Sequence, residues 1–163
     1  MSSPFTIPAY FPMLLFVENS SPEQEIPEIS ETGEEKALSD KELKTACFNF
    51  ARRHFQGKAF RNKSTNQNIT VSRGGLGEWK TKTRSRDQIV SIKILDKLLI
   101  HGTYWKDADD TEEDPNIDKY LYFRQNCKIN STEYTAIITI RVYKQDKRHK
   151  YYHHYLNDVL IKK

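Results

Sequence analysis

The sequence predicts an α+β domain in which N-terminal helices pack on one face of a small antiparallel β-sheet. An amphipathic pattern over residues 40–55 and a second one over residues 86–100 indicate two helices. Three segments rich in tyrosine and β-branched residues, 120–127, 134–143 and 150–156, then indicate strands. Because the helices precede a run of strands rather than alternating with it, the pattern favours α+β over α/β.

The first helix is predicted from Ser39 and Glu42, which have the spacing of a capping box. Gly57 is expected to end the helix. Residues 58–62 and 69–72 are expected to be short strands on either side of a polar turn. The predicted apolar face of the helix contains Leu43, Ala46, Cys47, Phe50 and Phe55.

Glycines, acidic residues and polar segments indicate loops and turns in the rest of the chain. Three glycines, at positions 74, 75 and 77, predict a loop over residues 73–78. The second helix is expected to end near His101 and Gly102. Residues 104–116 are acidic and predict a loop, with Tyr104 and Trp105 as its anchors in the core. Polar segments at 129–132 and 144–148 are typical of hairpin turns between the last three strands.

Charge divides the chain into an N-terminal arm and a basic body. Residues 1–40 carry eight acidic and one basic side chain, whereas the whole chain has a net charge of +4. Residues 5–17 are apolar but contain Pro8 and Pro12, and residues 18–37 are rich in Glu, Ser and Pro. We therefore expect residues 1–38 to form an extended apolar and acidic arm with a linker, and residues 39–163 to form the folded domain.

Several classes of protein are excluded by composition and motif. No apolar run reaches the roughly 18 residues of a transmembrane helix, so no membrane-spanning segment is predicted. Cys47 and Cys127 are too few for a disulfide scaffold and are expected to be buried free thiols. No phosphate-binding loop or HExxH motif is present, and the neighbouring His153 and His154 would point to opposite faces of a strand. The sequence therefore predicts no metal and no cofactor.

The basic body contains the residue types that RNA cleavage by its own 2′-hydroxyl requires. That reaction needs a proton acceptor, a proton donor and cations for the phosphorane, but no metal. Histidine serves as acid or base near neutral pH, and tyrosine holds a phosphate or stacks on a base. The predicted catalytic residues are His154, Glu78, Lys80, Arg141 and Tyr152, and the predicted substrate-binding residues are Ser72, Arg73, Lys82 and His153.

Each of these residues also has a plain structural interpretation. Glu78 could pair with a nearby lysine, and Lys80 and Lys82 could be solvated charges. Arg141 lies within an apolar strand, so it is either exposed on one sheet face or directed into a cleft; we favour the cleft. Of the two adjacent histidines, one should face the core and the other the solvent or a cleft, and His154 is the one we expect in the cleft.

Four segments resemble a group of nuclease-like domains: NFARRHFQGK (49–58), ITVSR (69–73), ILDKLL (94–99) and YYHHYL (151–156). The group comprises the barnase/EndoU/colicin/RelE-like domains of polymorphic bacterial toxins and of large polyvalent phage and mobile-element proteins. The resemblance covers about residues 40–157. It implies helices packed on an antiparallel sheet and metal-independent ribonuclease activity, often on tRNA. It also implies action in the bacterial cytoplasm after delivery into a target cell, with neutralisation by a cognate immunity protein.

The resemblance also places individual residues. The strand-ending Ser-Arg of the group falls on Ser72 and Arg73, and its following acidic and basic positions fall on Glu78 and Lys80. The closing Tyr-x-His falls on Tyr152 and His154, with His153 at the position where the group has an acidic residue.

Two other functions fit the same sequence. A non-catalytic nucleic-acid-binding module would use the same basic surface without cleaving. A phage or mobile-element interaction protein would instead use the arm at residues 1–38 as its contact. The sequence alone favours a toxin-type endoribonuclease with RNA and an immunity protein as partners, and leaves both alternatives open.

Overall fold

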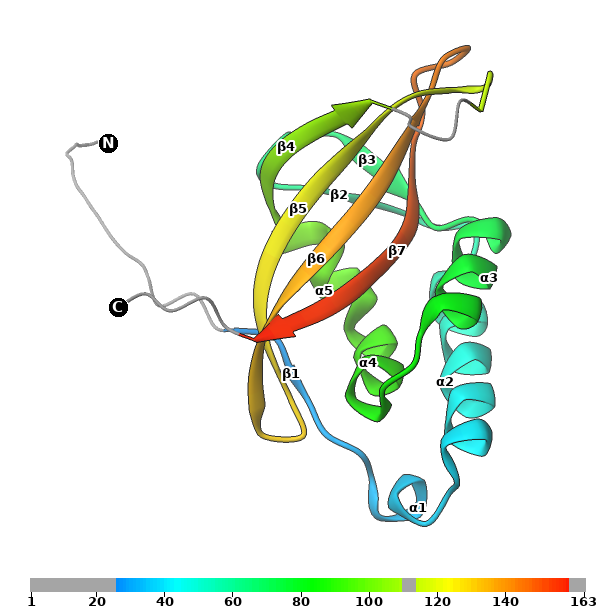
Figure 1. Cartoon of the computed structure of the whole chain (residues 1–163), viewed down its shortest axis with the longest axis vertical. Helices are drawn as coiled ribbons and strands as arrows, with labels where there is room; N and C mark the ends of the chain where they lie inside the picture. Colours follow the sequence, from blue (N-terminus) through cyan, green and yellow to red (C-terminus); the bar gives the residue numbers. More distant parts are fainter. Residues whose placement is uncertain (1–25, 110–113, 159–163) are drawn as a thin grey trace, which may run out of the picture.

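The computed structural model describes residues 26–109 and 114–158, so the first part of the predicted arm and the centre of the acidic segment lie outside the described residues. Helices α2 to α5 lie on one side of a curled sheet (Figure 1). The helices are α1 (Gly33–Lys36), α2 (Asp40–Phe55), α3 (Arg73–Lys82), α4 (Arg86–Ser91) and α5 (Leu95–His101). The strands are β1 (Glu28–Ile29), β2 (Ala59–Arg61), β3 (Asn68–Thr70), β4 (Thr103–Asp109), β5 (Ile117–Ile129), β6 (Thr132–Tyr143) and β7 (His149–Asp158).

The sheet is larger than predicted and mixed rather than purely antiparallel. Within the described residues it has seven strands in the order β1-β5-β6-β7-β3-β2, and β4 also pairs with β5. The long strands β5, β6 and β7 form the predicted antiparallel meander. However, β1 and β3 run parallel to β5 and β7, respectively. The class α+β is therefore correct, whereas the small antiparallel sheet was too simple a prediction.

Helix α2 forms where the sequence predicted it. Ser39 accepts a hydrogen bond from the backbone of Glu42, whose side chain accepts one from the backbone of Ser39. Leu43, Cys47 and Phe55 are buried as expected, but Ala46 is exposed. The predicted second helix is instead divided into α4 and α5 by a 3₁₀ turn over Ile92–Ile94. This stretch is rich in β-branched residues, which have a lower helix propensity than leucine.

The predicted glycine loop is in fact helix α3. Ser72 caps it by accepting a hydrogen bond from the backbone N–H of Gly75. Leu76 and Trp79 anchor the helix in the core, both fully buried. A Cβ on Gly75 would lie 2.1 Å from the carbonyl oxygen of Tyr151, so this glycine permits close contact between α3 and β7. Three glycines in five residues indicated a turn, and burial of the apolar face outweighed that local preference.

The predicted acidic loop is also wrong over its first part, because Thr103–Asp109 forms β4 and pairs with β5. Pairing with a long neighbouring strand satisfies the backbone of this polar segment, which local sequence did not indicate. Tyr104 and Trp105 are each 40% exposed rather than buried in the core.

Part of the predicted linker is folded onto the domain. Residues 26–38 contain β1 and α1, and β1 pairs with the end of β5. Arg86 forms ion pairs with Glu31 at 2.8 Å and with Asp40 at 2.8 Å. Asn130 donates a hydrogen bond to the Glu31 carboxylate and accepts one from its backbone N–H. These contacts attach the segment to α4 and to the β5–β6 turn.

The core lies between the helices and one face of the sheet. Cys47 and Cys127 are buried free thiols, as predicted, and burial raises the pKa of the Cys47 thiol to about 11 and that of Cys127 to about 12. Among the helices described, none is both long and apolar enough to cross a bilayer.

Candidate nucleic-acid interface

The sheet has a second face, opposite the helices, which we call the outer face. Cross-strand partners point to the same side of a sheet, so the strand register defines this face. Figure 1 shows the strands β5 to β7 that carry it. It consists of three rows across β5, β6 and β7: Tyr120–Arg141–Lys150, Tyr122–Thr139–His153 and Arg124–Ile137–Tyr155. The intervening residues, such as Phe123, Ile138 and His154, face the helices.

A cationic and aromatic group occupies the β7 side of the outer face. The guanidinium carbon of Arg141 lies 3.7 Å from the ring centre of Tyr152 and 6.0 Å from that of Tyr120. The rings of Tyr120 and Tyr152 are nearly parallel, with centres 5.9 Å apart. His153 adjoins Tyr152, with ring centres 4.9 Å apart. Together with Glu78 and Lys82 of α3, these residues form what we call the Arg141 cluster.

A β-bulge in β7 places two consecutive side chains in this cluster. The register of β6 and β7 shifts between Thr139 and Ile140, which pair with His153 and Tyr151. Tyr152 is therefore an extra residue on β7, and such a residue re-aims the side chains around it. As a result, both Tyr152 and His153 lie beside Arg141, which ordinary strand alternation would not allow.

Helix α3 contributes the remaining charges. Glu78 and Lys82 are one helical turn apart, and their charged groups lie 3.8 Å from each other. The ammonium of Lys82 lies 5.7 Å from the ring centre of Tyr152. Both side chains are about two-fifths exposed, so their mutual attraction is weak and either group is accessible to a ligand.

The electrostatics of the cluster keep His153 neutral near pH 7. Burial, followed by the positive charges of Lys82 and Arg141, lowers the pKa of His153 to about 4, against an opposing effect of Glu78. A bound anion such as a phosphate would raise this pKa, because an opposite charge favours the protonated form. Nε of Arg141 is buried and has no hydrogen-bond partner among the described residues.

His154 does not belong to this cluster, contrary to prediction. Its side chain is fully buried on the helix side of the sheet. One ring nitrogen lies 2.7 Å from the Ser91 hydroxyl, and the other lies 2.8 Å from the Tyr151 hydroxyl. Burial lowers the pKa of His154 to about 3. The strand alternation was predicted correctly, but the histidine that faces outward is His153.

Three further predicted site residues lie apart from the cluster. Ser72 caps α3, and Arg73 is exposed in the first turn of that helix. Lys80 faces α2, with its ammonium 4.6 Å from the ring centre of Phe48. The structure thus brings together Glu78, Lys82, Arg141, Tyr152 and His153.

Residues on β4 and β5 that share the outer face were not predicted from the sequence. Tyr120 stacks with Tyr152, and Trp105 lies beside Lys106 and Arg124, whose charged groups are 4.4 and 4.7 Å from its ring centre. The alternation of Tyr120, Tyr122 and Arg124 was a usable signal, since every second residue of a strand lies on one face.

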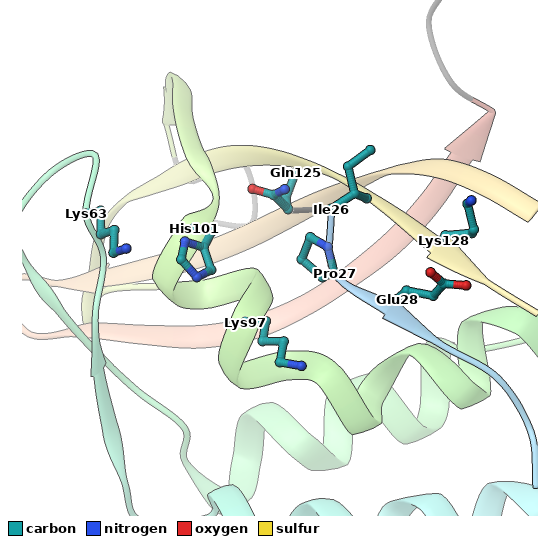
Figure 2. A pocket seen from close by; sticks show the side chains of 8 residues that line it. All are labelled: Ile26, Pro27, Glu28, Lys63, Lys97, His101, Gln125 and Lys128. Atoms are coloured by element: carbon teal, nitrogen blue, oxygen red, sulfur yellow. The ribbon is translucent and has the colours of Figure 1, made fainter. Parts of the chain in front are cut away.

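A separate basic groove lies on the helix side of the sheet, with a volume of about 910 Å³ (Figure 2). It is lined by α5, the start of β1, one edge of β5 and the turn after β2. Burial, together with the nearby Lys63 and Lys97, lowers the pKa of His101 in this groove against an opposing effect of Asp96. The lining residues are Ile26, Pro27, Glu28, Lys63, Lys97, His101, Gln125 and Lys128.

Comparison with known proteins places the chain in a family. No curated protein and no solved structure matches it. The family model of large polyvalent protein-associated domain 3 matches residues 39–155, a span that runs from the cap of α2 to β7 and includes the Arg141 cluster. This agrees with the polyvalent-protein context that the sequence resemblance implied. The chain belongs to the large polyvalent protein-associated domain 3 family.

Proposed function

We propose that this domain is a metal-independent endoribonuclease whose site is the Arg141 cluster. The observation that carries the proposal is the arrangement of Arg141 over Tyr152, beside His153 and the Glu78–Lys82 pair, where the outer face meets helix α3. Transesterification by the 2′-hydroxyl requires two groups that can carry a proton, and it also requires cations; this site offers two. Five residues predicted from sequence gather in this one place.

In the proposed reaction the 2′-oxygen of the RNA attacks the adjacent phosphorus and the 5′-oxygen of the next nucleotide leaves. Glu78 accepts the proton of the 2′-hydroxyl. His153, protonated once the phosphate is bound, donates a proton to the leaving oxygen. Arg141 and Lys82 stabilise the charge of the phosphorane, and Tyr152 orients the phosphate. The products are a 2′,3′-cyclic phosphate and a 5′-hydroxyl.

The biological setting is part of the same proposal. Membership in a polyvalent-protein-associated family supports a role in conflicts between mobile elements and bacteria. We therefore extend the proposal to a toxin-type activity in the bacterial cytoplasm after delivery into a target cell, with tRNA as the RNA cleaved and a cognate immunity protein as the inhibitor.

The test is incubation with total cellular RNA in excess EDTA, with end-group analysis of the products. Arg141→Ala should reduce the cleavage rate by roughly 100-fold, the usual effect of removing one donor to a transition-state oxyanion. Lys97→Ala is the matched control, since it removes a cation from the basic groove, away from the cluster. Fragments with cyclic phosphate ends that depend on Arg141 support the proposal. Equal cleavage by Arg141→Ala and the intact protein would place the reaction elsewhere.

A second candidate function is RNA binding without cleavage. The observation that favours it is the burial of His154 in the core, which leaves His153 as the one histidine of the cluster, with its pKa lowered to about 4. Intact RNA in the cleavage assay, together with affinity that falls steeply with salt and with Arg141→Ala, would identify this function.

A further inference from the structure

We propose that the β4–β5 side of the outer face is a stacking platform for unpaired RNA bases that lead into the Arg141 cluster. We call it the Trp105 platform, and it consists of Trp105, Lys106, Tyr122, Arg124 and Tyr155. The inference rests on the proposed function for its ligand, RNA. It adds a substrate class to that function, namely single-stranded RNA, and a second site of contact.

Trp105 is exposed because of an irregularity in β4. The register of β4 and β5 shifts between Tyr104 and Lys106, so Trp105 is an extra residue at a bulge. Its side chain lies on the outer face, since its ring contacts Lys106 and Arg124. Trp105 is 40% exposed, which is unusual for the largest apolar side chain. A large aromatic ring held on a sheet surface between two cations is suited to stack on a nucleobase.

The platform is continuous with the Arg141 cluster. Tyr122 pairs across the sheet with Thr139, which pairs with His153, and Arg124 pairs with Ile137, which pairs with Tyr155. Thr139 and Ile137 are buried beneath these larger neighbours and form the floor. With strands about 4.8 Å apart, the distance from β4 to β7 is about 14 Å. RNA-recognition motifs use a four-stranded sheet face to stack two or three bases.

Charge on the platform complements a phosphate backbone. Lys106 lies over the rings of both Trp105 and Tyr122, at 4.4 and 5.9 Å, and so remains near the path of a bound strand. The nearest carboxylate of β4, Asp107, pairs with Leu121 and therefore lies on the other side of the strand. There it accepts hydrogen bonds from Tyr104 and Lys119, which hold it away from the platform. Cations therefore outnumber carboxylates on this part of the outer face.

The arrangement selects single strands over duplexes. Stacking needs the flat face of a base, and in a duplex those faces are covered by neighbouring base pairs. The deep, narrow major groove of an A-form RNA duplex does not present its bases to side chains, so a duplex would lose the stacking contacts.

The experiment measures binding separately from cleavage. A single-stranded 2′-O-methyl RNA oligonucleotide lacks the attacking hydroxyl and cannot be cut by the proposed reaction. Titration into the intact protein should quench tryptophan fluorescence. Because the chain has two tryptophans and Trp79 is fully buried, the quenching reports on Trp105. This readout needs no variant.

Affinity of variants then tests the platform. Trp105→Ala should raise Kd by roughly 5-fold to 150-fold, the range for loss of one stacked base. Tyr104→Ala is the matched control, because Tyr104 is equally exposed but contacts Phe123 and Asp107 on the other face. Its Kd should stay within about twofold of the intact protein. A duplex of the same sequence should bind more weakly and leave the fluorescence unchanged.

The outcomes separate this inference from the proposed function. Unchanged affinity of Trp105→Ala, or equal affinity for duplex, would overturn the platform, and Arg141-dependent cleavage would still support the nuclease. A different outcome is that the strand quenches the fluorescence of the intact protein, Trp105→Ala loses affinity and ordinary RNA is not cleaved. That outcome would support the platform and refute the nuclease. Absence of any binding to the 2′-O-methyl strand would refute the platform whatever the cleavage result.

Discussion

The buried histidine of β7 should make the domain sensitive to mild acid. His154 has no exposed surface, and both of its ring nitrogens are engaged. Ser91 donates its hydroxyl hydrogen to the Gln88 carbonyl, so it must accept from Nε2–H of His154. Nδ1 then accepts from the Tyr151 hydroxyl. The network therefore fits the neutral imidazole and has no place for a second ring proton.

The size of the effect follows from proton linkage. The pKa of His154 is lowered from 6.5 to about 3 by burial and by His153, so the unfolded chain binds a proton that the folded chain does not. The unfolded state is then favoured as the pH falls below 6.5, and stability is lost at about 1.4 kcal/mol per pH unit. Between pH 7.5 and pH 5 the expected loss from this residue is about 2 kcal/mol.

The assay is urea unfolding of the intact protein and of His154→Gln at both pH values. Glutamine can accept from Tyr151 and donate to Ser91 but does not titrate, so the variant should lose about 2 kcal/mol less than the intact protein on acidification. His153, whose pKa is also lowered, acts equally in both proteins. The same loss in the two proteins would refute the assignment of a neutral, buried His154.

Two further predictions concern how elements are attached to the domain. Gly75→Ala should lower the free energy of unfolding by about 3 kcal/mol, the upper part of the range for overpacking, because its Cβ would overlap the Tyr151 carbonyl. Gly77→Ala is the control, since nothing outside its own helix backbone and chain neighbours lies within 4 Å of its Cβ, and it should be neutral or stabilising. Thermal unfolding of the two variants compares them. Arg86→Ala should loosen the segment around α1 by removing the ion pair of the Glu31 carboxylate, which would keep only its hydrogen bond from Asn130. Limited proteolysis should then cut within residues 31–38 faster than in the intact protein. Unchanged cleavage there would show that β1 pairing, the Asn130–Glu31 hydrogen bonds and the Lys93–Glu35 ion pair hold the segment without Arg86.

Local sequence signals predicted the elements whose stability is local. The capping box of α2 and the alternation in β5 to β7 depend on neighbours along the chain, so they were visible without a structure. Helix α3 and strand β4 were missed because their stability comes from distant contacts. Trp79 is buried against the core, and β4 depends on a partner strand beyond the acidic segment. The local conformational preferences of glycine and of acidic residues are weaker than the stabilisation that these distant contacts provide.

Five residues of the candidate site were predicted from the sequence by number, but which of the two histidines belongs to it was not. Strand alternation showed that only one of His153 and His154 could face outward, and it could not show which one, because the core side of β7 depends on register with β6. The bulge at Tyr152 is likewise a property of the pairing, and it explains why two consecutive residues accompany Arg141. Tyr120 enters the cluster through the pairing of β5 with β6, as the direct partner of Arg141.

Two of the three register irregularities in the described sheet have a shared consequence for function. One lies in β7 at Tyr152 and the other in β4 at Trp105, so they are at opposite sides of the same outer face. Each turns a large aromatic ring toward a cation that regular pairing would not place beside it. An unpaired strand residue costs backbone hydrogen bonding, and bulges that re-aim side chains are concentrated next to active sites. Their presence on one face supports the proposal that this face, rather than the basic groove beside α5, is the functional surface.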